Sequence, residues 1–167
     1  MNNVNKTLYI PLYGKAFVSK KQVILEDKNA EEIWAKEGFE LKGKAKSKWL
    51  AYYMGMRSAV FDTWVKKKIV QYPSASVLHI GCGMDSRMER IGAEKTVWYD
   101  IDFPAVIEER KKYYTETENY HMLSEDASKI EWIAAIPKTE HAIIVMEGLS
   151  MYLKLQELVA LLSALKE

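Results

Sequence analysis

The chain has 167 residues, of which 49% are hydrophobic and 28% are charged, and its formal net charge is +1. This composition permits one core of ordinary globular size, and the balanced charge argues against a nucleic-acid-binding surface. The first residues lack the apolar segment of a signal peptide, and no apolar run approaches the roughly 18 residues of a membrane span, so we expect a soluble cytoplasmic protein.

Residues 1–72 are expected to be helical and to form an N-terminal cap or lid. The pattern predicts a short helix over Ala30–Glu37 that is ended by Gly38, and a long helix over Trp49–Tyr72 that is stopped by Pro73. Residues 73–167 then form a second domain.

One face of the long helix is apolar, because large side chains recur at spacings of three and four. Packing of this face in the core is the favoured interpretation. The alternative is a lid that excludes water from an active site. We call this set the aromatic stripe, and it comprises Trp49, Tyr52, Tyr53, Met56, Ala59, Val60 and Trp64.

From residue 76 onward, short apolar runs alternate with helical patterns, which predicts a parallel sheet with helical crossovers. The expected strands are Ser76–Ile80, Thr96–Ile101, Tyr120–Ser124 and His141–Met146. The expected helices are Arg87–Ile91, Pro104–Tyr113, Lys129–Ala135 and Leu155–Lys166. Ser86 and Glu89 have the spacing of a capping box at the first of these helices.

A glycine turn follows the first strand, where Gly81 and Gly83 let the backbone approach a ligand. Dinucleotide-binding turns have a third glycine that closes the helix around a pyrophosphate, and Ser86 occupies that place here. The carboxylate of Asp85 would repel a phosphate but attract an ammonium group. The turn therefore favours S-adenosylmethionine over NAD or FAD.

The second strand ends in an acidic residue about twenty positions after the turn, as in Rossmann-type nucleoside sites. Asp102 is the first candidate for accepting both ribose hydroxyls, since a carboxylate offers two acceptors to a diol. Asp100 lies two residues earlier on the same face and is the second candidate.

Four segments, in order, resemble the leucine carboxyl methyltransferase family and, within it, a bacterial branch of polyketide O-methyltransferases. The segments are Thr7–Ala16, Gly81–Arg90, Trp98–Pro104 and Glu147–Leu153. The resemblance implies a Rossmann-like class I methyltransferase fold whose complete sheet has seven strands in the order 3-2-1-4-5-7-6. This chain supplies the first four, so it is expected to be truncated at the C-terminus. We expect the isolated chain either to self-associate through the exposed edge of the fourth strand or to be a portion of a longer protein.

Further site residues follow from the resemblance. It places Asp126 and Ala127 beside the adenine, although Asp126 could instead cap a helix that begins near Ser128. Glu147 ends the fourth strand where the strand order reverses, so it is expected to face the ligand crevice, either holding the methionine ammonium or ordering arginine side chains.

Two N-terminal cations, Lys15 and Arg57, are implied to approach carboxylates of the cofactor or of the acceptor. Arg87 is expected to be a structural partner of Asp85 or Glu147. Tyr152 either touches the acceptor or fills the core.

The resulting expectation is an O-methyltransferase that uses S-adenosyl-L-methionine, releases S-adenosyl-L-homocysteine and methylates a carboxylate or hydroxyl of a small, polyketide-like molecule. The alternative is a non-catalytic cofactor-binding fragment of such an enzyme. The single cysteine, Cys82, is interpreted as a space-filling turn residue, and His79, His121 and His141 as strand residues, so no metal site is expected, nor any membrane or nucleic-acid partner.

Overall fold

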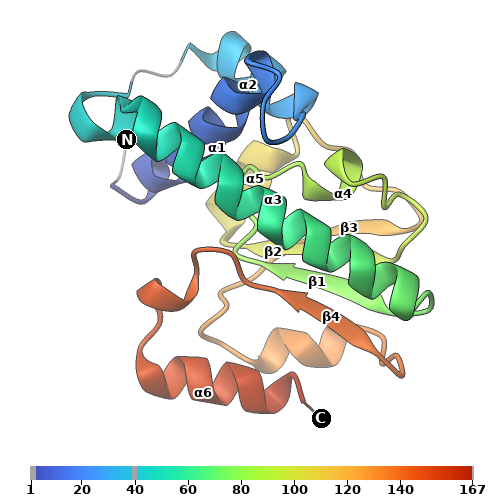
Figure 1. Ribbon diagram of the computed structural model, residues 1–167. Coiled ribbons are helices and arrows are strands. Elements are labelled where there is room, and N and C mark those ends of the chain that lie inside the picture. Colours follow the sequence, from blue (N-terminus) through green and yellow to red (C-terminus); the bar gives the residue numbers. More distant parts are fainter. Residues whose placement is uncertain (1–2, 39–40, 167) are drawn as a thin grey trace. The chain divides into compact units, whose positions relative to one another are not determined.

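Two groups of elements make up the chain in the computed structural model, which describes residues 3–38 and 41–166 (Figure 1). Unit 1 consists of the chain up to Lys66 together with Met84–Ala93, and unit 2 consists of Lys67–Gly83 and the chain from Glu94 onward. The predicted domain boundary between residues 72 and 73 stays a prediction, and the helical assignment of residues 1–2 and 39–40 lies outside the described residues.

Unit 1 is helical. The Asp27 carboxylate begins the second helix by accepting the amide of Ala30 at 2.9 Å, and Gly38, with a φ of 61°, ends it, as the sequence predicts. The elements of unit 1 are α1 (Asn3–Lys20), α2 (Lys28–Glu37), a 3₁₀ turn (Gly43–Lys46), α3 (Lys48–Gln71), whose last turn belongs to unit 2, and α4 (Arg87–Arg90).

The buried face of α3 differs from the predicted one. Trp49 is 74% exposed and Val60 is 70% exposed, so the interpretation of the aromatic stripe as core is wrong. The reason lies in the contact with α1, where an added Cβ on Gly55 would come within 2.8 Å of Val18. Only small side chains allow this approach. The buried residues of α3 are Ala51, Gly55, Ser58, Asp62 and Val65.

Unit 2 contains a four-stranded parallel sheet in the order β3-β2-β1-β4, which confirms the predicted strands and their order. The register places His79 opposite Asp100 and Val77 opposite Ile143. The strands are β1 (Ser76–Ile80), β2 (Trp98–Asp102), β3 (Tyr120–Ser124) and β4 (Ala142–Val145).

Helices cover both faces of this sheet (Figure 1). One face packs a core around Leu78, Ile101 and Trp132 under a 3₁₀ helix, Glu131–Ala135, and α6 (Leu155–Ala164). Alternate strand residues face the other way, toward α5 (Pro104–Arg110). The predicted helices thus form, but the one expected over Lys129–Ala135 is a short 3₁₀ turn.

Within the described sheet, β4 pairs with β1 and forms one edge. The expected self-association through this edge stays a prediction. Among the described residues, no helix combines the length and hydropathy that crossing a membrane requires.

Candidate functional site

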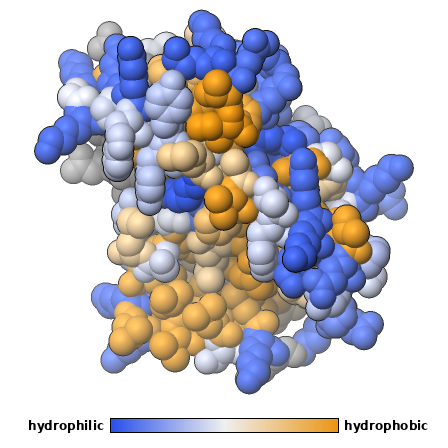
Figure 2. Space-filling model, viewed as in Figure 1, coloured by the Kyte–Doolittle hydropathy of each residue, from blue (hydrophilic) through white to orange (hydrophobic). Residues whose placement is uncertain are grey.

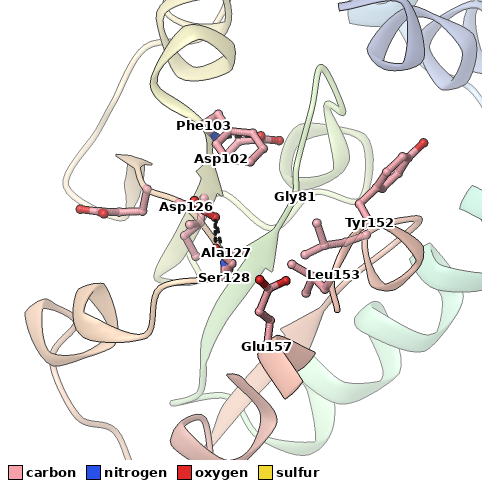
Figure 3. Close-up of a pocket in the computed structure, with 12 residues that line it drawn as sticks. Gly81, Asp102, Phe103, Asp126, Ala127, Ser128, Tyr152, Leu153 and Glu157 are labelled. Atoms are coloured by element: carbon pink, nitrogen blue, oxygen red, sulfur yellow. Dashed lines mark hydrogen bonds between the residues drawn. The ribbon is translucent and has the colours of Figure 1, made fainter. Parts of the chain in front are cut away.

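A pocket of about 180 Å³ opens in unit 2 at the carboxyl ends of the parallel strands (Figure 3). Gly81 follows β1, Asp102 ends β2, Asp126 follows β3 and Leu149 lies beyond β4, and each of these residues lines the pocket. In open parallel sheets this edge is where ligands bind, next to the point at which the strand order reverses. Here that point lies between β1 and β4.

Both turn glycines adopt the left-handed conformation, with φ values of 72° for Gly81 and 53° for Gly83. The Gly81 amide donates to the Ile101 carbonyl at 2.8 Å, which ties the turn to β2. An added Cβ on Gly81 would come within 3.1 Å of the Leu149 side chain on the pocket wall. The backbone conformation therefore favours glycine at both positions, and at Gly81 an added Cβ would also crowd Leu149.

Asp102 connects β2 to the glycine turn. Its Oδ2 accepts the amide of Gly83 and its Oδ1 accepts the amide of Phe103, both at 2.8 Å. Burial raises the pKa of Asp102, although these two amides act in the opposite direction. Each oxygen keeps a second lone pair, so the carboxylate can still accept hydroxyl groups from a ligand in the pocket.

Asp100, the second ribose candidate, has a different place. Its Oδ1 accepts from the rings of His79 and Trp98, each at 3.0 Å, and its Oδ2 accepts from Arg110 and from the Tyr120 hydroxyl. Burial acts to raise the pKa of Asp100, but the Arg110 charge and the hydrogen bonds outweigh it and lower the pKa to about 2. Its carboxylate belongs to this buried cluster and does not line the pocket.

Asp126 and Ala127 both line the pocket. Oδ1 of Asp126 accepts the backbone amide of Ser128 at 2.9 Å and its hydroxyl at 2.7 Å, and these hydrogen bonds lower the pKa of Asp126. The carboxylate thus stabilises a turn, since the next helical segment begins only at Glu131.

Glu157 lines the pocket and was missed by the sequence reasoning. It is the third residue of α6, where Oε2 accepts the amide of Lys154 at 2.8 Å, and Figure 3 shows its carboxylate directed into the pocket. The sequence did contain a clue to this role: Glu157 is the third residue of the helix that follows β4, and β4 ends beside the pocket. Tyr152 also borders the pocket, but it is 65% exposed and therefore does not fill the core.

Two other predicted ligand contacts, Lys15 and Asp85, lie in unit 1. The Asp85 carboxylate is surrounded by three cations: Lys15 Nζ at 3.1 Å, Arg90 Nη1 at 2.7 Å and Arg87 Nη2 at 3.1 Å. The expected Arg87–Asp85 pair is therefore confirmed. Lys15 and Asp85 are both buried, and neither lines the pocket of unit 2.

The expected capping box at α4 does not form. The Ser86 hydroxyl makes no cap hydrogen bond and donates instead to Asp27 Oδ1 at 2.6 Å, because Asp27 lies beside it in unit 1. Arg57 and Glu147 are half-buried and are not among the pocket-lining residues, so their ligand roles stay predictions. Within residues 3–38 and 41–166, no group of three or more His, Cys, Asp or Glu side chains is arranged to hold a metal.

Comparison with known proteins agrees with this geometry. The model of the leucine carboxyl methyltransferase family matches residues 3–166. The chain is 30% identical over 156 residues to the tetracenomycin polyketide synthesis O-methyltransferase TcmP of Streptomyces glaucescens, a match that covers 92% of this chain and 58% of TcmP. It is 24% identical over 179 residues to the S-adenosyl-L-methionine-dependent methyltransferase dpfgK of Gibberella zeae, covering 97% of this chain and 60% of that protein.

The chain thus spans about three fifths of the length of these curated relatives. The family match extends over nearly all of it, from α1 to the end of α6. The chain belongs to the leucine carboxyl methyltransferase family, whose methyl donor is S-adenosyl-L-methionine.

Proposed function

We propose that this chain binds S-adenosyl-L-methionine and is part or all of an O-methyltransferase acting on a carboxylate or hydroxyl of a small molecule. The observation that carries the proposal is the charge of the pocket. Four of its twelve lining residues are acidic, namely Asp102, Glu125, Asp126 and Glu157, and none of the twelve is Lys or Arg.

This lining suits a nucleoside without phosphate. Ribose hydroxyls and the exocyclic amine of adenine are hydrogen-bond donors, and Asp102 and Asp126 offer acceptors to them. A pyrophosphate in the same place would meet only like charges, which costs several kcal/mol at close range in a partly buried site. A volume of about 180 Å³ is below the roughly 300–1,000 Å³ of complete ligand pockets, so it accommodates one end of the cofactor.

The task of the protein in this reaction is to position the acceptor oxygen against the methyl group of the cofactor. When bound, S-adenosyl-L-methionine would supply a methyl carbon whose bond to the positive sulfur breaks as an acceptor oxygen's lone pair forms the new bond. This leaves S-adenosyl-L-homocysteine and a methyl ester, or a methyl ether when the acceptor is a hydroxyl that releases its proton to solvent. A carboxylate acceptor is already ionised at neutral pH. The protein then has to hold oxygen and carbon about 3–3.5 Å apart and in line.

The class of methyl acceptor is inferred from the name of a related protein. TcmP is named as a polyketide synthesis O-methyltransferase, so a polyketide-like acid or phenol is the first class to test. Tyr152, exposed at the rim of the pocket, is the candidate for contacting it.

Calorimetric titration with S-adenosyl-L-homocysteine, S-adenosyl-L-methionine and NAD⁺ tests the proposal. We expect the first two to bind and NAD⁺ to give no heat. Binding of NAD⁺ without a response to S-adenosyl-L-homocysteine would overturn it. A methyl-transfer assay with a panel of aromatic acids and phenols then separates an active enzyme from a non-catalytic cofactor-binding fragment.

A further inference from the structure

Both polar groups of the Gly83 peptide backbone are held by side chains. Its amide donates to Asp102 Oδ2 at 2.8 Å, and its carbonyl accepts from Arg110 Nη1 at 2.8 Å. Glycine restricts its own backbone less than any other residue, so its conformation has to come from its surroundings. At the second glycine of the turn, Asp102 and Arg110 supply these contacts.

Arg110 is the last residue of α5 and is fully buried. A buried guanidinium is costly unless it is paired, and Arg110 pairs with the Asp100 carboxylate. Its Nη2 also donates to the Tyr120 hydroxyl at 2.9 Å. The ion pair thus offsets the cost of a cation whose other terminal nitrogen reaches the Gly83 carbonyl.

The Asp100 end of this pair is fixed by further contacts. Besides Arg110, the carboxylate accepts from His79 on β1, Trp98 on β2 and Tyr120 on β3. Three neighbouring strands therefore hold Asp100, and Asp100 holds Arg110. The position of the guanidinium is set by the sheet.

The geometry points to Arg110 as a positioning residue for cofactor binding, acting through the Gly83 carbonyl to keep the glycine turn in register with Asp102. This inference rests on the proposed function, because it concerns the same pocket. Asp102 and Arg110 contact opposite ends of one residue, so loss of the Arg110 contact frees the turn while leaving the ribose acceptor in place.

Arg110→Lys and Tyr120→Phe form a matched pair of variants. Lysine retains a charge beside Asp100 but lacks the planar fork that reaches two partners at once. Phenylalanine removes hydrogen bonds to Asp100 and Arg110 and leaves the Gly83 contact intact. Both variants weaken the buried cluster, and only Arg110→Lys breaks the contact with the turn.

We expect R110K to bind S-adenosyl-L-homocysteine roughly tenfold more weakly than wild type, the size of a lost charge-assisted hydrogen bond, while Y120F binds within about twofold. Thermal unfolding of both variants measures the shared loss of stability. The inference is wrong if folded R110K binds like wild type, or if Y120F loses as much affinity as R110K.

The ¹³C resonance of the Gly83 carbonyl provides a readout without ligand. In wild type it should show the downfield shift of a strongly hydrogen-bonded carbonyl, and it should move upfield in R110K but not in Y120F. An ordinary shift in wild type would overturn the inference even if R110K fails to fold. If wild type binds no S-adenosyl-L-homocysteine, the proposed function fails, whereas the carbonyl resonance still reports on the Arg110 contact.

Discussion

Arg90 binds Asp62 through two nitrogens at once, with Nε 2.8 Å from Oδ2 and Nη2 2.9 Å from Oδ1. The remaining nitrogen, Nη1, reaches Asp27 at 2.8 Å and Asp85 at 2.7 Å. The Arg90 side chain is only 3% exposed, and its guanidinium therefore pairs with three carboxylates from separate parts of unit 1. The planar fork of arginine suits this arrangement, because it pairs with one carboxylate through two nitrogens and keeps a third nitrogen for other acceptors.

Replacing this hub should destabilise the protein strongly. Arg90→Met leaves the three buried carboxylates with Lys15 and Arg87 as cationic partners. Removing one partner of a buried ion pair costs about 3–5 kcal/mol of stability. Urea unfolding followed by circular dichroism measures the loss. Lys112→Met, which breaks an exposed pair with Glu109, is the control and should change stability by less than about 1 kcal/mol.

Two valines of α3 test which face of the helix is buried. Val65 has 0% exposure and Val60 has 70%. Val65→Ala should cost about 1–3 kcal/mol through lost burial and a cavity, whereas Val60→Ala should stay within about 0.5 kcal/mol of wild type. Equal losses in urea unfolding would mean that the aromatic stripe is buried in solution.

Alanine substitutions at two glycines with similar backbone conformations distinguish the effect of backbone strain from that of a change in pocket shape. Gly81 and Gly92 have φ values of 72° and 69°, so alanine at either position costs roughly 1–2 kcal/mol. Only Gly81→Ala would push against Leu149 on the pocket wall, while Gly92 faces open space. We expect both variants to melt earlier and only Gly81→Ala to lose affinity for S-adenosyl-L-homocysteine in calorimetry.

Affinity for S-adenosyl-L-homocysteine should fall as the pH is lowered. We propose that the ionised carboxylate of Asp102 accepts both ribose hydroxyls. Burial raises the pKa of Asp102, so protonation sets in at a higher pH than for an ordinary aspartate. Asp126, whose pKa is lowered by Ser128, stays ionised in that range. Calorimetry across the acid range should show weaker binding, and Asp102→Asn should bind more weakly with a flat profile. A wild-type profile that is equally flat would contradict the assignment.

The pKa of Asp100 is lowered, whereas that of Asp102 is raised, and the ionised Asp100 stabilises the fold against acid. Its folded pKa is lowered from 3.8 to about 2, so the stabilisation is fully present above 3.8 and is lost as the pH falls toward about 2. Asp100→Asn should be less stable at neutral pH, with a shallower decline of stability through that window. Urea midpoints measured at several pH values check both parts.

Local sequence patterns were sufficient to predict most of the strands and helices of unit 2. Alternation of apolar runs with helical segments predicted the bounds of β1 and β3 and a parallel sheet. The order of the strands was implied by the family resemblance. Strand β1 was clearest, because a strand buried on both faces reads directly as an apolar run. Periodicity also located α3, but it could not say which face is buried. That was decided by Gly55 and Val18, which meet only once the chain has folded.

Polar contacts between distant residues explain the remaining differences. Asp100 and Asp102 are equivalent in strand period, yet the partners that bury Asp100 come from positions as far away as His79 and Tyr120. Ser86 has the spacing of a helix cap, but its hydroxyl donates a hydrogen bond to the carboxylate of Asp27, 59 positions earlier in the chain. A single sequence does not reveal such pairs.

The boundary between the two units crosses the chain three times, at residues 66/67, 83/84 and 93/94. No single cut can therefore release either unit whole. A fragment ending at residue 72 would keep Asp27 and Asp62 and lose Arg87 and Arg90, the cations that bind them. The helical unit includes ten residues, Met84–Ala93, that follow the first strand of the sheet in the chain, so neither unit can be expressed whole as one continuous fragment.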